Sequence, residues 1–244
     1  MKPPFYDKIT QYETGINSLH KAYECLTDSN YDYVTGILIR HNNLGRALIT
    51  IYDDNKTIIS QIPIELYNYY LNYIAKVDSF IPILFKANGR KFYVSVDFEK
   101  TGAPVNTTLV VYFRQEIREN VILPAVVNDF QNKKILAASQ TSIDDLVRLN
   151  SAYTDIKGVL TIDNTTYFDN LTIRDSDKIV VNKLPTAIIS YQRELPMRKQ
   201  FFPFEFPYKA GAELKLEAEL TGVSTESFNI IFLLQRKSNV TDFN

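Results

Sequence analysis

The segment KFYVSVDF, Lys91–Phe98, decides the fold class because its side chains alternate strictly. Every second residue from Phe92 to Phe98 is apolar, and the residues between them are tyrosine, serine and aspartate. An extended chain points successive side chains to opposite faces, so this pattern predicts a strand with one buried face. We therefore start from a mainly β protein.

The same segment belongs to a stretch that occurs twice. FKANGRKFYVSVDFEKTGAPVNTTLVVYFRQE begins at Phe85, and YKAGAELKLEAELTGVSTESFNIIFLLQRK begins at Tyr208. Each has an aromatic residue, Lys-Ala and a glycine, then an alternating strand, a Thr-Gly pair and a closing apolar strand. The closing strand reaches Gln115 or Gln235 fourteen residues after that threonine. We interpret this as two copies of one β module; the alternative is that alternating strands look alike by chance.

Further strand-like segments lie around both copies, separated by turn residues at the spacing of a sandwich or barrel. We predict three domains: an arm at 1–31, a first β-sandwich module at 32–120 and a second at 121–244. The first half adds DYVTGILIRHNN, RALITIYDDN and KTIISQIPI, and the second adds KKILAAS, IKGVLTID, TTYFDNLTI, KIVVN and PTAIISYQREL.

Three segments have helix-like spacing instead. The first is an apolar stripe that predicts an N-terminal helical arm, made by Ile9, Tyr12, Ile16, Leu19, Tyr23 and Leu26. The second is a short helix capped by Ser142, with a face of Ile143, Leu146, Val147 and Leu149. The third is ELYNYYLNYIAKV, in which Leu66, Tyr70, Tyr73 and Val77 share a face.

The segment RKQFFPFEFPYKAG, Arg198–Gly211, concentrates aromatic residues and proline. Proline removes a ladder donor, so this run suits the edge of a sheet or a crossing at its rim. Phe202, Phe204 and Phe206 then share one face. Two interpretations stay open: these rings cap the core of their own module, or the rings of Phe201, Phe206 and Tyr208 insert into an adjacent subunit.

The composition argues against several classes of function. The 244 residues carry 27 basic and 28 acidic side chains, so the formal net charge of −1 gives no global attraction to nucleic acid or an anionic membrane. The single cysteine excludes an intramolecular disulfide. We expect no secretory signal, because MKPPFYDKIT has no apolar core, and no bilayer-spanning stretch.

Residues that carry chemistry are few, and we expect no catalytic, cofactor or metal site. Only His20 and His41 are histidines. His20 lies five residues before Cys25, which allows a Cys–His nucleophile, but an idle buried cysteine is the simpler interpretation. The segment DNTTYFDNLTIRDSD offers aspartates at a spacing that matches no EF-hand, and we favour a solvated turn.

The ending FFPFEFPYKAGAELKLEAELTGVSTESFNIIFLLQRK resembles the C-terminal part of jelly-roll structural proteins in tailed-phage virions. The first half is similar to the first module of such proteins, and the style rich in Asn, Lys and Tyr resembles crAss-like phages. The resemblance covers about Asp32 to Lys237. It implies two tandem jelly-roll-like antiparallel sandwiches, and a non-enzymatic virion subunit assembled in the host cytoplasm.

The role that the resemblance implies is a ring or collar protein of the portal–tail region, or an auxiliary capsid or head-decoration protein. Its partners would be copies of itself in a ring and other virion proteins. Two other functions stay open: a carbohydrate-binding sandwich that uses Tyr67, Tyr69, Tyr70 and Tyr73, and a hydrolase on a β scaffold. We predict an assembly interface made by Ile9, Tyr12, Ile16, Leu19, Tyr23, Leu26, Phe201, Phe204, Phe206 and Tyr208.

Overall fold

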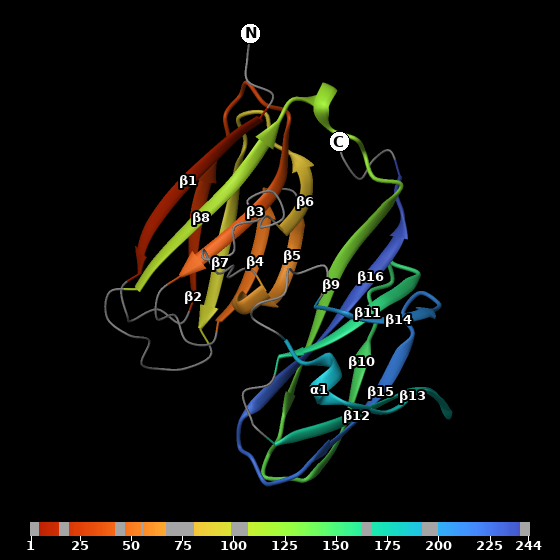
Figure 1. Cartoon of the computed structure of the whole chain (residues 1–244). Coiled ribbons are helices and arrows are strands. Elements are labelled where there is room, and N and C mark those ends of the chain that lie inside the picture. The colour runs from red at the N-terminus through yellow and green to blue at the C-terminus, as the bar shows by residue number, and fades with distance from the viewer. Residues whose placement is uncertain are drawn as a thin grey trace. The chain divides into compact units, whose positions relative to one another are not determined.

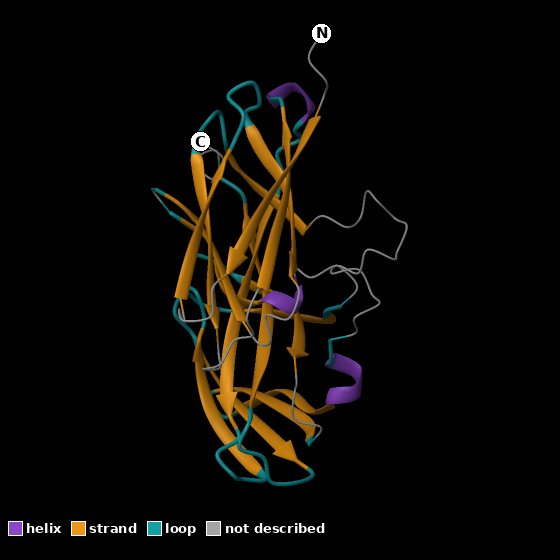
Figure 2. Ribbon diagram, turned by 90° about the vertical axis from the view of Figure 1, so that its left-hand side faces the viewer, coloured by secondary structure: helices purple, strands orange, loops and turns teal. Residues whose placement is uncertain are grey.

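The computed structural model divides into two compact units, shown in Figure 1. Unit 1 comprises Met1–Ala125 with Ser238–Asn244, and unit 2 comprises Val126–Lys237. The structure describes residues 5–14, 20–41, 47–54, 56–66, 81–98, 107–162, 167–191 and 200–239. Strands and the turns between them make up most of this part of the chain, as Figure 2 shows.

Unit 1 contains two four-stranded antiparallel sheets. The first sheet has the order β1 (Phe5–Thr14), β8 (Thr107–Glu116), β3 (Tyr33–His41) and β6 (Ile81–Lys86). The second has the order β2 (His20–Leu26), β7 (Lys91–Phe98), β4 (Ala47–Asp53) and β5 (Thr57–Pro63). Two single 3-10 turns follow strands, η1 at Ile64–Leu66 and η2 at Arg118–Asn120.

Unit 2 repeats this arrangement. One sheet has the order β14 (Phe202–Pro207), β11 (Asp155–Ile162), β16 (Ser227–Lys237) and β9 (Val126–Leu136). The other has the order β10 (Ser142–Arg148), β15 (Glu213–Leu220), β12 (Phe168–Asp175) and β13 (Lys178–Pro185). A single helical turn, α1 (Thr186–Ile189), follows β13.

The two units have the same topology. In each, the first, eighth, third and sixth strands form one sheet, and the second, seventh, fourth and fifth form the other. This is the jelly-roll order, in which the chain winds between two facing sheets. The expectation of a mainly β chain with two sandwich modules is therefore confirmed.

The two units also share a hydrogen bond between a backbone N–H and a threonine side chain. In unit 1 the backbone N–H of Gln61 donates to Thr50 Oγ1 at 3.2 Å, and in unit 2 the N–H of Lys183 donates to Thr172 Oγ1 at 3.0 Å. Gln61 and Lys183 both have a positive φ, at 48° and 45°, which few residues other than glycine adopt. Each stands two residues before the proline that ends its strand, so the two units contain the same irregularity in the same place.

Prolines also occupy matching places. Pro82 lies opposite Gly36, and Pro203 lies opposite Gly158, each after a register shift in the pairing. Both prolines lie on an edge strand, β6 or β14. A proline cannot donate to a further strand, so it suits the edge of a sheet. The edge position predicted for the aromatic–proline run is confirmed.

The repeated stretches run from the end of β6 through β8 in unit 1 and from the turn after β14 through β16 in unit 2. Gly89 lies in the β6–β7 turn and Gly211 in the equivalent β14–β15 turn. Their φ values are 75° and 74°, a conformation that glycine adopts without strain. The two glutamines are not equivalent, however. The Thr154 N–H donates to the carbonyl of Gln235 just as the Asp32 N–H donates to that of Glu116, so Gln115 lies one position earlier than the sequence match implies.

The core of each unit lies between its two sheets. In unit 1, Phe92, Val94 and Val96 of the deciding segment are fully buried, and Phe113 packs edge-on against Phe92. In unit 2, Phe228 stacks on Phe168 with ring centroids 4.3 Å apart. Aliphatic residues of β12 and β15 complete this core, namely Leu171, Ile173, Leu214, Leu216 and Ala218.

The predicted N-terminal helical arm is wrong for the described part of 1–31. Those residues form β1 and β2, and in β2 the side chains of Tyr23 and Cys25 point inward while His20 and Leu26 are exposed. The sequence did not reveal the strand-like alternation of Tyr23 and Cys25, because the apolar residues of this segment also fit the helical spacing of three and four. Pairing of β2 with β7 selects the strand.

Two further expectations fail for similar reasons. The segment after Ser142 forms β10, in which Ile143 and Val147 face the core and Leu146 faces away, so the predicted helical face does not exist. The segment Thr186–Ile189, expected within a strand, forms α1. The third predicted helix is described only at Glu65 and Leu66 of η1, and the rest lies outside the described residues. No described helix is both long and apolar enough to span a bilayer.

Candidate assembly surfaces

The aromatic–proline run forms edge strand β14 and fills its own unit. Phe204 is buried in the core of unit 2, and Phe202 and Phe206 are half-buried against it. Tyr208 is also buried, and its hydroxyl donates to the carbonyl of Asn150 at 3.0 Å. Burial raises the pKa of Tyr208 to about 12. The geometry thus supports the interpretation in which these rings cap the core.

Phe201 lies differently, across the neighbouring strand β11. A Cβ atom at Gly158 would lie 2.8 Å from Phe201 Cβ and 3.2 Å from the carbonyl oxygen of Phe202. Glycine at 158 therefore allows the start of β14 to approach β11 closely. The Phe201 ring stacks on Phe130 of β9, with centroids 5.6 Å apart, and it remains half-buried.

The other predicted interface residues have mixed placements. Tyr23 is buried and Leu26 is exposed on β2. Ile9 and Tyr12 lie on β1, opposite Tyr112 and Leu109, and their side chains lie outside the described part. Ile16 and Leu19 lie outside the described residues. Of the predicted set, Leu26, Phe201 and Phe206 are the described side chains with substantial surface to offer a neighbour.

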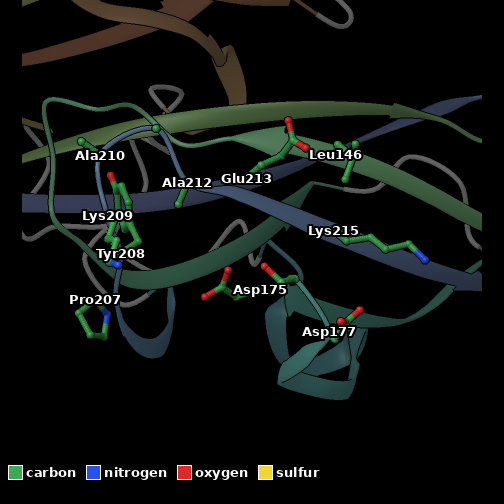
Figure 3. A pocket seen from close by; sticks show the side chains of 12 residues that line it. Leu146, Asp175, Asp177, Pro207, Tyr208, Lys209, Ala210, Ala212, Glu213 and Lys215 are labelled. Atoms are coloured by element: carbon green, nitrogen blue, oxygen red, sulfur yellow. The ribbon is translucent and has the colours of Figure 1, made fainter.

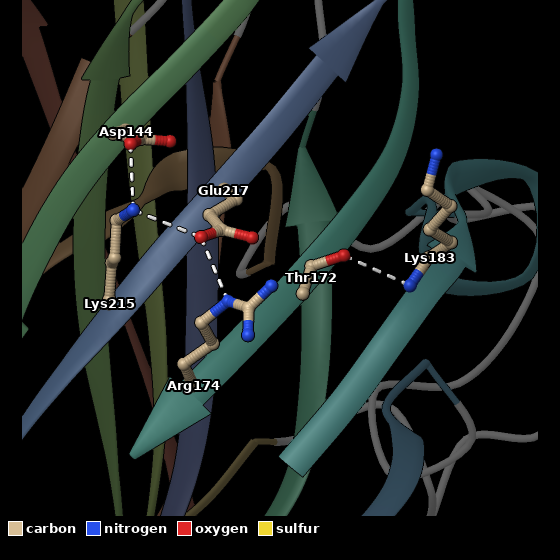
Figure 4. Close-up of polar contacts among 6 residues, drawn as sticks. All are labelled: Asp144, Thr172, Arg174, Lys183, Lys215 and Glu217. Carbon is tan, nitrogen blue, oxygen red and sulfur yellow. Dashed lines mark hydrogen bonds and ion pairs between the residues drawn. The ribbon is translucent and has the colours of Figure 1, made fainter. Parts of the chain in front are cut away.

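A ladder of ion pairs covers the outer face of the sheet β10-β15-β12-β13 (Figure 4). Lys215 Nζ lies 2.8 Å from Asp144 and 3.0 Å from Glu217, and Arg174 Nε lies 2.9 Å from the same Glu217 carboxylate. The ammonium of Lys215 and the guanidinium of Arg174 hold the pKa of Glu217 below its usual value. Because acidic and basic side chains alternate along this chain of contacts from Asp144 to Arg174, their charges offset one another and the face is suited to water.

A shallow groove of about 790 Å³ lies beside this ladder, between the β12–β13 turn and the β14–β15 turn (Figure 3). Asp175 and Asp177 line one side, and the chain from Pro207 to Glu213 lines the other. Among the described residues that line the groove, Tyr208 is the aromatic one, and its ring is buried rather than presented as a platform for a sugar. The tyrosine cluster at 67–73, which was the candidate for sugar stacking, lies outside the described residues.

Two arrangements resemble catalytic groups but lack the required geometry. Ser95 and Asp97 both contact Nδ1 of exposed His20, whereas a catalytic triad uses both ring nitrogens, one for each partner. Cys25 is fully buried and faces the core, while His20 faces outward. An odd separation of five places two strand residues on opposite faces, so they do not form a Cys–His pair.

The aspartates that suggested a cation loop lie mainly on strands. Asp169 and Asp175 belong to β12, where Leu171 and Ile173 face the core between them, and Asp177 follows in the next turn. Asp163 lies outside the described residues. Among the described side chains, no group of three or more histidine, cysteine or acidic residues is placed to hold a metal ion.

Asp129 on β9 is a carboxylate in an unusual environment. Its Oδ1 accepts the backbone N–H of Phe130 at 2.8 Å, Tyr153 also bonds to it, and the positive charge of Arg236 lies near. Burial outweighs these contacts and raises the pKa of Asp129 to about 6. The folded chain therefore holds a proton there at a pH where the unfolded chain has released it.

We expect the free energy of unfolding to fall by on the order of 2 kcal/mol as pH rises from about 4 to 6 through this group alone. The sign follows from the raised pKa of Asp129, since the folded state binds more protons across this window. Urea unfolding at pH 4 and pH 7, compared between the natural chain and Asp129→Asn, isolates the contribution. A pH dependence that is the same in both proteins would contradict it.

No family model and no curated protein sequence matches this chain. Among solved structures, the major capsid protein P2 of bacteriophage PM2 is similar over 96% of this chain and 99% of that chain, with 9% sequence identity and a TM-score of 0.53. The chain has a double jelly-roll fold that resembles the fold of this capsid protein. At this identity the likeness concerns the fold alone.

Two other solved structures align over similar lengths with lower scores. Peptide: N-glycanase F covers 98% of this chain and 97% of its own, at 9% identity and a TM-score of 0.43. A chain of Sulfolobus turreted icosahedral virus covers 96% of this chain and 93% of its own, at 12% identity and a TM-score of 0.26. Neither score is high enough to support an argument about fold or function.

Proposed function

We propose that this chain is a non-enzymatic structural subunit of a virus capsid, either of the main shell or as an auxiliary protein on it. The observation that carries the proposal is the pair of jelly rolls with one topology, which extends over nearly the whole chain and matches a major capsid protein in fold. The matching edge prolines and register shifts of the two units support the proposal, because they show that both modules have the same strand pairing.

A ring or collar role in the portal–tail region of a crAss-like phage was the first expectation from the sequence resemblance. The structural likeness favours the capsid alternative, since the similar structure is a capsid protein. The absence of a global charge is compatible with this choice, because a shell subunit binds its own copies. The location that follows is the virion.

Assembly then rests on contacts between copies of the chain and with other virion proteins. Leu26 on β2 and the half-buried rings of Phe201 and Phe206 on the β14 edge are the predicted interface residues best placed to contribute. The rings of Phe201 and Phe206 are already held by their own unit, so they lose little conformational freedom when a partner covers them. Aromatic side chains of this kind are common anchors of protein interfaces.

We expect the purified chain to form oligomers or shell fragments as its concentration is raised. Mass photometry and negative-stain electron microscopy measure the stoichiometry and the shape of these particles. A chain that stays monomeric at high concentration, and also in the presence of the other virion proteins, would contradict the proposed function.

A further inference from the structure

Strands β9 and β10 run along the same side of unit 2. Among the strands that the structure describes, each lies at the edge of its sheet, and Lys133 Nζ of β9 lies 2.9 Å from the Asp145 carboxylate of β10. An edge strand presents a row of backbone N–H and C=O groups that can pair with a strand of another molecule. Copies of the chain could therefore join by strand addition on this side, unless its own side chains prevent it.

The pairing of each strand shows which backbone groups point outward. Ala137 donates its N–H to the chain just before β16, and Leu149 donates its N–H to the chain just before β15. Inward-bonded and outward-facing residues alternate along an antiparallel ladder, and the β9–β16 and β10–β15 pairings run without a register shift. Counting back along each strand, the N–H groups of Phe130 and Leu146 point outward, away from the partner strand.

An aspartate covers each of these two outward N–H groups. Asp129 Oδ1 accepts the N–H of Phe130 at 2.8 Å, and Asp145 Oδ1 accepts the N–H of Leu146 at 2.7 Å. In both cases the acceptor belongs to the preceding residue, so the carboxylate turns from its own face of the strand onto the edge. A strand from another molecule would have to displace the carboxylate before it could pair with either donor.

The two aspartates belong to a polar row on the core-facing side of the two edges. Asp145 alternates with buried residues of β10, and its partner Lys133 is on the same face of β9 as buried Ile135. Gln131, also on that face, donates through Nε2 to the carbonyl of Arg148 at 2.7 Å, and this carbonyl points outward from β10. Charged side chains that point inward on an edge strand hinder strand addition, because a docked strand would bury them.

Unit 1 makes one of these contacts with a different side chain. Lys8 on β1 occupies the position of Gln131 on β9, since each lies opposite the fully buried phenylalanine of the eighth strand of its unit. Lys8 Nζ donates to the carbonyl of Leu26 at the end of β2 at 2.6 Å, as Gln131 does to that of Arg148 at the end of β10. The contact is kept although the residue types differ, which indicates that both units need this side closed.

We propose that this polar closure, with Asp129 and Asp145 covering the outward donors, prevents β9 and β10 from pairing with strands of other copies of the chain. The remaining edges of unit 2 have other protection: β14 carries Pro203, and the pairing of β13 contains register shifts. Copies then associate through surfaces other than these edges. The inference goes beyond the proposed function and does not depend on it, because an open edge endangers any sandwich that is present in many copies.

Replacement of Asp145 tests the proposal. Asp145→Ala uncovers the N–H of Leu146 and is expected to lower the concentration at which the chain self-associates by at least about tenfold, because the donor can then pair with an added strand. Asp144→Ala is the matched control, since Asp144 lies 2.8 Å from Lys215 Nζ on the outer face (Figure 4). Asp145→Asn keeps a side-chain oxygen that can accept the same N–H, and it is expected to associate less readily than Asp145→Ala.

A second change separates strand addition from aggregation of unfolded chains. Leu146→Pro removes the uncovered donor, so the double variant Asp145→Ala with Leu146→Pro is expected to lose the added association. Sedimentation velocity measures the association, and thermal melting confirms that each variant is folded. Hydrogen exchange reports whether the amide of Leu146 gains protection when the Asp145→Ala protein associates. If Asp145→Ala does not fold, Asp129→Ala with hydrogen exchange at Phe130 provides the same comparison on β9.

Three results would overturn the proposal. The first is a folded Asp145→Ala protein that associates no more than the natural chain. The second is association that proline at 146 leaves unchanged, since the contact then lies elsewhere. The third is a gain of protection at the Leu146 amide when the natural chain assembles, because β10 would then be an assembly edge. A natural chain that never assembles contradicts the proposed function alone, and the comparison between the variants still holds.

Discussion

Replacing Phe113 or Phe232 with alanine is expected to lower the free energy of unfolding by about 3–5 kcal/mol in each case. Both rings are fully buried, and they occupy matching positions, Phe113 opposite Ile37 and Phe232 opposite Val159. Each truncation removes apolar area and leaves a cavity between two sheets that cannot close completely. The expected losses of stability are similar because each ring lies on the eighth strand of its unit and is surrounded by equivalent strands.

Urea unfolding followed by near-ultraviolet circular dichroism measures these losses. Phe113→Leu and Phe232→Leu are expected to cost less than the alanine variants, since more of the volume is retained. Ile122→Ala, at a side chain that is 92% exposed, serves as a surface control and is expected to change stability by no more than about 0.5 kcal/mol. A loss below about 1 kcal/mol in either alanine variant would show that the ring does not support its core.

The second large effect is expected at Gly158. Alanine there places a Cβ 2.8 Å from Phe201 Cβ and 3.2 Å from the carbonyl oxygen of Phe202, and neither atom is the free end of a flexible side chain. The two strands must separate, which costs about 1–3 kcal/mol as in other overpacked interiors. The smaller entropy of unfolded alanine offsets part of this, by about 0.4–1 kcal/mol.

Chemical denaturation of Gly158→Ala measures the net change. Lys157→Ala is the matched control on the same strand, since Lys157 makes a surface ion pair with Glu205 at 3.4 Å and its loss is worth less than about 1 kcal/mol. Combining Gly158→Ala with Phe201→Gly is expected to recover part of the loss, because the closest contact disappears. Equal stabilities of Gly158→Ala and the natural chain would show that β14 does not lie against β11.

The sequence was sufficient to predict the structure wherever a local pattern fits only one type of secondary structure. Lys91–Phe98 alternates strictly and forms β7, and the prolines of the Phe202–Pro207 run place that strand at an edge. The duplicated stretches also occupy matching strands, so the two modules were predictable. A period of two and a missing N–H donor act within the segment itself, which is why no long-range information was needed.

The sequence was insufficient where one spacing fits two structures. The stripe from Ile9 to Leu26 and the segment after Ser142 have apolar residues three or four apart, yet the described part of the stripe and the segment after Ser142 form strands. Short windows do not separate these periods, and partner strands far along the chain decide between them. For the same reason the spacing of His20 and Cys25 suggested neighbours on a helix, whereas β2 places them on opposite faces.

What the sequence determined by itself is thus the sandwich class, its duplication and the proline-marked edge, because each follows from the geometry of an extended chain. Only the tertiary structure decided that Gly158 lies under Phe201 and that the N–H of Thr221 donates to the carbonyl of Tyr167. Those contacts join residues tens of positions apart. Their existence depends on how eight strands pair in register, which no local pattern of side chains specifies.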